Sequence, residues 1–343
     1  MNEKKTVGVG LIAAGRIGTS HASIVANRLI RADLVAIADP VSGAADKLAT
    51  TLGCPAVYTD AKALIADPAV DAVIIATPAR FHTNMVELAA NAGKAVFCEK
   101  PMALTLAEAD RAIAAAKSNG VLLQVGFNRR WDQAFSEGYD AIAAGKVGTP
   151  QLLRSLTRDP GPFKGDPSKI PQWTIFFETL IHDFDTLLWL NRGAKPVEVF
   201  ATADALVRPD AKAQGHLDTS VVTIRFDNGA IAVAEANFSA LYGYDIRGEV
   251  FGSAGMVTMG DVRRSSMTLF CAAGASNDTW RMDTDEFIDA YTAQLTAFVD
   301  AVRTGKFAGP NGMDARSALA VALACIESVK TNQPVRISDR DFH

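Results

Sequence analysis

The sequence predicts two domains: an α/β domain built on a parallel sheet, and after it an α+β domain with a large, mostly antiparallel, open-faced sheet. Three observations lead to this fold class. Apolar strands alternate with helical segments as far as residue 126, runs of strands dominate the part that follows, and 343 residues suffice for two cores of ordinary size. We therefore expect a first domain over residues 1–126 and a second over residues 127–343.

The first domain is expected to alternate strands with helices. The expected strands span residues 6–12, 32–39, 70–77, 94–100 and 121–127. The expected helices span residues 16–29, 44–53, 81–93 and 105–120, and the last three end on a glycine. Strands that are apolar on both faces and separated by helices predict a parallel sheet covered on both sides, so we predict a Rossmann nucleotide-binding domain.

The second domain is expected to consist mainly of antiparallel strands. These strands span residues 151–159, 197–207, 219–226, 230–240, 246–260 and 265–273. The segment FDNGA (Phe226–Ala230) predicts a hairpin turn, and two helices, at 285–305 and 313–332, close the chain. Because a large one-sided sheet must cover its outer face, we expect an oligomer built through this sheet.

The composition is that of an ordinary globular protein, with 49% hydrophobic and 21% charged residues and a net charge of -4. It has no basic block that would indicate nucleic acid and no cationic amphipathic helix or long apolar run that would indicate a membrane. The start, MNEKKTVGVGLIAAG, resembles a signal peptide only superficially, because its short apolar run leads into a glycine-rich turn. Four widely spaced cysteines without a CxxC pattern favour reduced thiols in a cytoplasmic protein.

Two features of the first domain predict a dinucleotide site. The segment AAGRIG (residues 13–18) matches the GxGxxG fingerprint with Ala13 in place of the first glycine. Gly15 would let a pyrophosphate approach the helix N-terminus, and Gly18 would let helix and strand pack closely. Asp39 ends the second expected strand, where a carboxylate accepts hydrogen bonds from ribose hydroxyls and repels a 2'-phosphate; otherwise it is a turn residue. No arginine follows it directly, so NAD is favoured over NADP.

Lys100 in the segment CEKPM (residues 98–102) lies at the carboxyl end of the fourth expected strand and precedes a proline. This is where a nicotinamide ring would lie. A lysine there can orient a substrate hydroxyl and stabilise the alkoxide that develops as hydride leaves. The alternative interpretation is a solvated loop lysine.

The apolar segment FFETLIHDFD (residues 176–185) carries Glu178, His182 and Asp185 at helical spacing, so the three side chains lie on one face. These residues can form an ion pair on the surface, a core histidine whose hydrogen bonds are made by its neighbours, or a row of catalytic side chains that faces a pocket. One histidine and two carboxylates can also bind a divalent ion, but we expect no metal. Activity that survives a strong chelator would exclude the metal site.

Several of these motifs resemble the Gfo/Idh/MocA oxidoreductases over essentially the whole chain. The resemblance is carried by AAGRIGTSHA, by residues 71–105 with the EKP turn, by VGFNRRWD, by the IHDFD helix and by the closing helices. The segments NRRWD, LTRDPGP and YGYDIRGEVFGSAG are most similar to the inositol dehydrogenase branch. The resemblance implies an NAD-dependent enzyme that oxidises one ring hydroxyl of an inositol, myo- or scyllo-inositol, or of a similar polyol, to a ketone. It also implies that the oligomer is a homotetramer, or else a dimer, built through the second-domain sheet.

The resemblance also implies roles for individual residues. Lys100 corresponds to the catalytic lysine, His182 to the general base, and Glu178 to the position where the family usually has aspartate. The implied substrate-binding residues are Lys100, Asp159, Glu178, His182, Tyr244 and Tyr291. The expected cofactor-binding residues are Ala14, Gly15, Arg16, Ile17, Asp39, Thr77, Pro78, His82, Glu99 and Lys100.

The chain departs from the family near this helix. Trp173 and Thr174 replace a Gly-Gly pair, and the insert PFKGDPSKIPQ (residues 162–172) can reshape the pocket. The alternative function is therefore an NAD-dependent sugar dehydrogenase that acts on an aldose or glycoside, since a pyranose and an inositol present similar hydroxyls. Two further alternatives are a glycosidase that retains NAD and a nucleotide-binding sensor without turnover.

Overall fold

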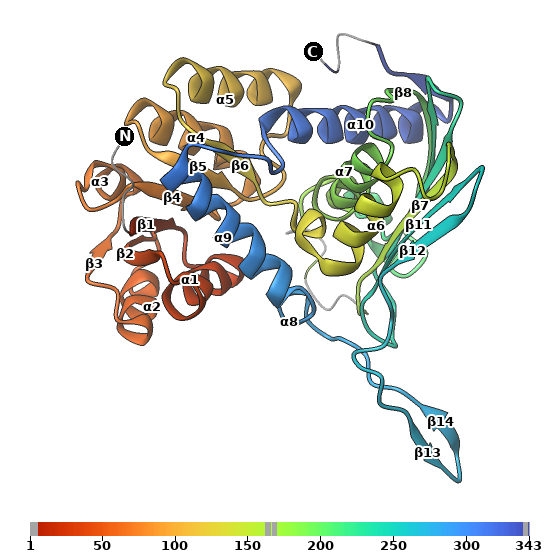
Figure 1. Ribbon diagram of the computed structural model, residues 1–343, viewed down its shortest axis with the longest axis horizontal. Coiled ribbons are helices and arrows are strands. Elements are labelled where there is room, and N and C mark those ends of the chain that lie inside the picture. Colours follow the sequence, from red (N-terminus) through yellow and green to blue (C-terminus); the bar gives the residue numbers. More distant parts are fainter. Residues whose placement is uncertain (1–5, 162–165, 167–169, 339–341, 343) are drawn as a thin grey trace. The chain divides into compact units, whose positions relative to one another are not determined.

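The computed structural model describes residues 6–161, 166, 170–338 and 342 (Figure 1). The chain forms two compact units: residues 1–131 together with 289–316, and residues 132–288 together with 317–343. The predicted domain boundary between residues 126 and 127 stays a prediction. The compact units differ from the predicted domains mainly in where residues 289–316 belong. Residues 289–316 follow most of the second unit in the chain but pack with the first.

The first unit contains a six-stranded parallel sheet in the order β3-β2-β1-β4-β5-β6. Its strands are β1 (Val7–Ile12), β2 (Ala32–Ala38), β3 (Ala56–Tyr58), β4 (Ala72–Ile75), β5 (Ala95–Cys98) and β6 (Leu123–Val125). Strands β1 and β4 are buried along their whole length, as expected for a sheet covered on both faces. The predicted Rossmann sheet is confirmed. The prediction missed β3 and the helix α3 (Ala61–Ala66), which are too short to show periodicity.

Helices complete the first unit. They are α1 (Arg16–Arg28), α2 (Ala44–Leu52), α3, α4 (His82–Asn91), α5 (Leu106–Ser118) and α9 (Ile288–Thr304), with the 3-10 turns η1 (Ala79–Phe81) and η2 (Asn128–Trp131). Helix α9 belongs here because its buried face packs on the sheet. The ring of Phe298 lies edge-on to that of Phe97 at 5.8 Å, and Gln124 Nε2 donates to the carbonyl oxygen of Gln294 at 3.0 Å.

The second unit is built on a seven-stranded sheet in the order β12-β11-β7-β10-β9-β8-β15. Its strands are β7 (Pro150–Arg158), β8 (Pro196–Asp204), β9 (Thr219–Phe226), β10 (Ile231–Asn237), β11 (Asp245–Gly252), β12 (Met256–Met259) and β15 (Val335–Arg336). Strands β7 and β10 pair in parallel and the other pairs are antiparallel, so the predicted mostly antiparallel sheet is confirmed. The predicted hairpin turn joins β9 to β10, and Gly229 has a φ of 88° there.

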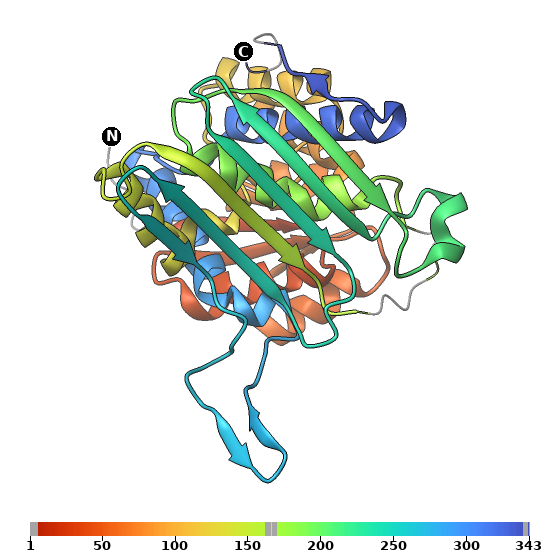
Figure 2. The same ribbon diagram turned by 90° about the vertical axis from the view of Figure 1, so that its right-hand side faces the viewer.

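Helices lie on one face of this sheet, and its other face is open (Figure 2). The helices are α6 (Gln133–Ala143), which the sequence analysis did not predict, α7 (Ile181–Leu190) and α10 (Gly312–Thr331). Alternate residues of β9 are buried and exposed, as expected for a sheet with one open face. Exposed apolar side chains on the strands of this sheet are Leu152, Val221, Ile231, Phe251 and Met256.

A two-stranded hairpin, β13 (Leu269–Cys271) and β14 (Gly274–Ser276), projects from the second unit (Figures 1 and 2). We call residues 263–279, which a bridge between Arg263 and Thr279 closes, the hairpin arm. All six strand residues of the arm are exposed. The predicted single strand at 246–260 is wrong, because the segment turns between β11 and β12, where the Gly252 N–H donates to the Gly255 carbonyl.

The predicted helix at 285–305 is also interrupted, into α8 (Asp283–Glu286) and α9. Within the described part of the chain, no helix is both long enough and apolar enough to cross a membrane.

Candidate active site

The turn after β1 carries the dinucleotide fingerprint. Ala13, which replaces the first glycine, has a left-handed φ of 79°. A Cβ added at Gly18 would lie 2.0 Å from the Ala13 carbonyl oxygen, so only glycine lets α1 pack this closely on the turn. Gly15 is different: its φ of -70° suits any residue, and an added Cβ would meet nothing within 4 Å. The protein's own packing therefore gives no reason for a glycine at position 15.

Asp39 ties the end of β2 to this turn. Its Oδ2 accepts the Ala14 N–H at 2.7 Å, and its Oδ1 accepts the Val41 N–H, also at 2.7 Å. A carboxylate has about four acceptor positions, so two remain for ribose hydroxyls. Asp39 is only 8% exposed, and its carboxylate would repel a 2'-phosphate.

The residues around this turn fit a dinucleotide. Gly15 is the N-cap residue of α1 and supplies no side-chain cap, which leaves the first-turn N–H groups for an anion. Arg16 is exposed and Ile17 half-buried in that turn. Thr77, after β4, has a buried hydroxyl that no described residue hydrogen-bonds, and Pro78 next to it is exposed. These groups follow β1 and β4, between which the strand order reverses, where Rossmann folds bind ligands.

Lys100 lies in the turn after β5, at the same edge of the parallel sheet as the fingerprint turn. Its backbone N–H donates to Glu99 Oε2 at 3.2 Å. Glu99 is buried, and its Oε1 lies 2.6 Å from Nε2 of the fully buried His21 of α1. Burial raises the pKa of Glu99, but His21 and Lys100 lower it by more, so the pKa lies below its ordinary value.

His82, at the start of α4, is 1% exposed and contacts two loops. Its Nδ1 lies 2.7 Å from the carbonyl oxygen of Pro101, and its Nε2 lies 2.7 Å from that of Thr77. His82 therefore joins the loop after β4 to the loop that carries Lys100.

Tyr291 also lies in the first unit. It is buried in α9, with its ring edge-on to that of His21 at 5.5 Å. The aromatic rings of Phe97 and Tyr291 thus both contact His21. The predicted role of Tyr291 in substrate binding remains a prediction.

In the second unit, Glu178 and His182 lie on consecutive helical segments. Glu178 belongs to a π-helical turn, η4 (Ile175–Leu180), and His182 to the first turn of α7. Both side chains are half-buried, whereas Asp185 is 1% exposed. The sequence predicted a regular α-helix here; the structure has an i→i+5 turn, a feature that is frequent at functional sites.

Asp183 was not among the predicted site residues. Its buried carboxylate accepts hydrogen bonds from Ser155 Oγ at 2.5 Å and from Thr157 Oγ1 at 2.7 Å, and both donors lie on β7. These bonds fix α7, and with it His182, against the sheet. The signal for this contact is the pair of hydroxyl residues at alternate positions of β7.

Trp173, where the family resemblance implied a glycine, has a left-handed φ of 63°. Its ring lies 5.5 Å from Lys330 Nζ and 6.3 Å from the ring of Phe176. The side chain therefore packs within the second unit. Most of the insert at 162–172, namely residues 162–165 and 167–169, lies outside the described residues.

Asp159 and Tyr244 are both half-buried residues of the second unit. The Asp159 N–H donates to the Asn237 carbonyl at 2.9 Å, and the Tyr244 N–H donates to the Trp280 carbonyl at 2.9 Å. These bonds place the two residues at the ends of β7 and β11. Their predicted contacts with substrate remain predictions.

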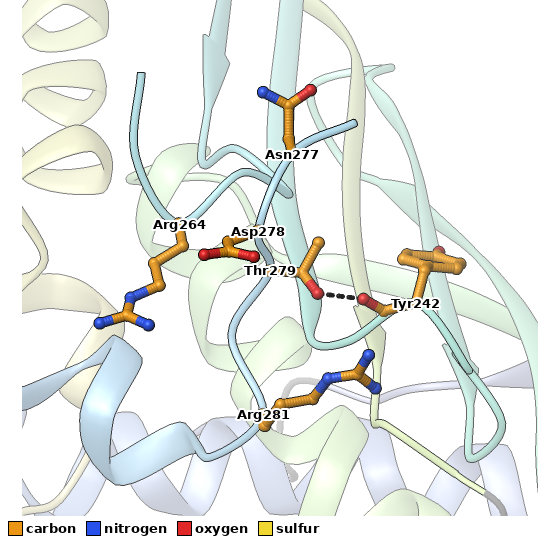
Figure 3. Close-up of a pocket in the computed structure, with 6 residues that line it drawn as sticks. All are labelled: Tyr242, Arg264, Asn277, Asp278, Thr279 and Arg281. Carbon is orange, nitrogen blue, oxygen red and sulfur yellow. Dashed lines mark hydrogen bonds between the residues drawn. The ribbon is translucent and has the colours of Figure 1, made fainter. Parts of the chain in front are cut away.

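A separate pocket of about 460 Å³ lies at the base of the hairpin arm (Figure 3). Its lining residues are Tyr242, Arg264, Asn277, Asp278, Thr279 and Arg281. The Thr279 hydroxyl donates to the Tyr242 carbonyl oxygen. No predicted site residue lines this pocket. Among the residues that the structure describes, no three or more His, Cys, Asp or Glu side chains are grouped to hold a metal ion.

Comparison with known proteins shows what this arrangement is similar to. Residues 7–127 match the model of an oxidoreductase family with an NAD-binding Rossmann fold, and residues 135–258 match the GFO/IDH/MocA C-terminal domain. The chain is 35% identical to the myo-inositol 2-dehydrogenase of Thermotoga maritima, over 96% of this chain and 98% of that protein. It is also 35% identical to the scyllo-inositol 2-dehydrogenase (NAD(+)) of Bacillus subtilis, over 95% of each.

Solved structures show the same fold. The scyllo-inositol dehydrogenase of Lactobacillus casei, solved with NAD(H) and scyllo-inositol, superimposes with a TM-score of 0.93 at 27% identity. That alignment covers 97% of this chain and 99% of the other. A probable dehydrogenase from Thermotoga maritima gives a TM-score of 0.91 at 35% identity, over 96% of this chain and 98% of the other.

Proposed function

The chain belongs to the Gfo/Idh/MocA oxidoreductase family, and from this premise we propose that it oxidises one ring hydroxyl of an inositol to a ketone with NAD. The observation that carries the proposal is the position of Lys100. It follows β5 at the sheet edge where the fingerprint turn and the Thr77 hydroxyl also lie. The near full-length relatives that are named inositol dehydrogenases favour myo- or scyllo-inositol as the substrate.

NAD, when bound, supplies the hydride acceptor. The residues expected to hold it are the first turn of α1, Asp39 and the Thr77 loop. In the proposed reaction, Lys100 hydrogen-bonds the substrate oxygen and stabilises the negative charge that develops there. His182 accepts the proton of the same hydroxyl group, and Glu178 fixes the imidazole tautomer and stabilises its charged form.

We also propose a homo-oligomer, a tetramer or a dimer, built through the seven-stranded sheet. The support is the row of exposed apolar side chains on its strands, from Leu152 to Met256, and the exposed Phe270 of the hairpin arm. A two-stranded hairpin is marginally stable by itself, so a partner surface would stabilise the arm. A cytoplasmic location remains part of the proposal and agrees with four free cysteines.

The experiment that tests the activity is NADH formation with purified protein, NAD and a substrate panel of myo-inositol, scyllo-inositol, glucose and several glycosides. We expect NAD-dependent turnover with an inositol and little with NADP. Turnover only with a sugar would keep the mechanism and support the alternative substrate class. No NADH, with release of an aglycone from glycosides, would contradict the proposal in favour of the hydrolase.

The role of Lys100 is tested by Lys100→Met. Loss of one preorganised donor at the developing oxyanion costs about 100- to 1000-fold in kcat. NAD binding, followed by isothermal titration, should stay within about threefold of wild type, because the fingerprint turn and Asp39 are untouched. Wild-type turnover in Lys100→Met would refute the assigned role.

A further inference from the structure

The backbone on each side of the Lys100 side chain is hydrogen-bonded to a buried group. On one side, the Lys100 N–H donates to Glu99; on the other, the Pro101 carbonyl accepts from His82. Neither bond involves the lysine ammonium itself. They fix the position from which this side chain extends.

The first contact runs through Glu99 to helix α1. His21 is fully buried, and because an ionised carboxylate only accepts, its Nε2 donates to Glu99 Oε1 over 2.6 Å. His21 lies three residues after Gly18, on the helix that begins at the fingerprint turn. The Lys100 backbone is therefore connected through one carboxylate to the helix expected to bind the pyrophosphate.

A glycine makes room for this carboxylate. A Cβ added at Gly126 would lie 2.9 Å from Glu99 Oε1 and 3.2 Å from Oε2, and no left-handed backbone requires glycine there. The backbone at Gly126 is fixed, since its N–H donates to the Cys98 carbonyl. The Glu99 carboxylate thus occupies the space that any other residue at 126 would fill.

The second contact runs through His82 to the loop after β4. The two ring nitrogens lie 2.7 Å from the carbonyl oxygens of Pro101 and Thr77. The rigid ring holds both nitrogens at fixed positions, and a glutamine, with a single amide NH2 group on a flexible chain, cannot reproduce both contacts.

We propose that His21 and His82 are positioning residues for Lys100: through Glu99 and through the Pro101 carbonyl, they hold the lysine backbone in the place that hydride transfer requires. This inference rests on the proposed function, in which Lys100 is catalytic. A lysine side chain is long and flexible, so its ammonium can be placed only as accurately as its backbone. A misplacement of about 1 Å can cost roughly 100-fold in rate.

The same unit offers a matched control at the opposite edge of the sheet. Lys94 precedes β5, and its Nζ donates to the carbonyl oxygens of Val70 at 2.6 Å and of Asp67 at 3.2 Å. Like His82, it contacts two backbone carbonyl oxygens with one side chain. Unlike His82, it lies at the amino end of the strand, away from the Lys100 turn. Lys94→Met removes such a bridge without affecting the position of Lys100.

The test compares His82→Gln, Lys94→Met, Lys100→Met and the double variant Lys100→Met/His82→Gln in the full chain. The readouts are the single-turnover rate of NADH formation with an inositol, KM, the NAD dissociation constant and Tm. For His82→Gln we expect a rate at saturating NAD about 10- to 100-fold lower, with KM for the inositol within about threefold of wild type. The loss of NAD affinity should be smaller than the loss of rate, although the Thr77 loop loses the same imidazole contact. Lys94→Met should lower Tm about as much as His82→Gln does, and it should leave the rate unchanged.

The double variant shows whether His82 acts through Lys100. With the ammonium gone there is nothing left to position, so the double variant should react at the rate of Lys100→Met alone. A rate lowered by the product of the two single effects would overturn the inference. So would a wild-type rate in His82→Gln, or a loss confined to NAD affinity.

Failure of the inference can be told from failure of the proposed function. If Lys100→Met is inactive but His82→Gln has the wild-type rate, only the positioning role is wrong. If Lys100→Met is fully active, the catalytic role of the lysine is wrong and the positioning role with it. Should His82→Gln not fold, Gly126→Ala, which displaces the Glu99 carboxylate, takes its place: a lowered rate at unchanged NAD affinity supports the inference, and an unchanged rate overturns it.

Discussion

Substitution of two glycines in the fingerprint turn should distinguish an effect on cofactor binding from an effect on stability. Gly15→Ala introduces a Cβ where the φ is ordinary and no protein atom lies within 4 Å, so the free energy of unfolding should change by less than about 1 kcal/mol. If a pyrophosphate packs against Gly15, the methyl group displaces it from the first-turn N–H groups. Loss of one hydrogen bond to a charged group costs about 1.5–3 kcal/mol, which raises the NAD dissociation constant about 10- to 150-fold.

Gly18→Ala is the matched comparison, because its Cβ would lie 2.0 Å from the Ala13 carbonyl oxygen. Helix α1 must then move, at a cost of about 1–3 kcal/mol in stability. Isothermal titration with NAD and urea denaturation of both variants measure the two effects. Gly15→Ala that binds NAD with wild-type affinity would refute the assignment of this turn to the pyrophosphate.

Four further outcomes are expected. Ala13→Gly relieves a left-handed alanine and should raise the free energy of unfolding by about 0.5–1 kcal/mol in urea. Asp183→Asn leaves one strand hydroxyl without its acceptor and should lower that free energy by about 1–3 kcal/mol in the same assay. The Glu99 carboxyl, whose pKa is depressed, contributes stability that is complete above its ordinary pKa of 4.5 and is lost as the pH falls through the lower folded-state pKa. Glu99→Gln should therefore lose less stability than wild type between about pH 5 and about pH 3. Cys271 is the one exposed cysteine of the four, so a thiol reagent such as Ellman's should modify it first in the native protein, and faster reaction elsewhere would contradict the described burial.

Much of the first unit could be predicted because its signals are local. Five apolar strands, the fingerprint turn and Lys100 at a strand end each follow from a short stretch of sequence. Strand β3 was not predicted because its three half-buried residues show no periodicity. The location of α9 could not be predicted, because an amphipathic helix shows that it has a buried face but not which sheet covers it.

The site of the second unit was predicted only in part. The spacing of Glu178 and His182 predicted the helix that carries them, but the π-helical turn depends on tertiary packing that no pattern of 3.6 residues reveals. Asp183 was overlooked because its partners, Ser155 and Thr157, lie on a distant strand. Trp173 was noted as an unusual residue, whereas its left-handed backbone became visible only in the structure.

The return of α9 to the first unit has a consequence for synthesis on the ribosome. The nascent chain can form all six parallel strands by residue 125, yet the surface of His21 and Phe97 that Tyr291 and Phe298 cover stays bare until α9 emerges. A nascent first unit would meanwhile expose apolar rings of the kind that chaperones bind. A fragment truncated after residue 131 would expose the same surface permanently. A soluble nucleotide-binding fragment therefore requires residues 289–316 to be appended through a linker.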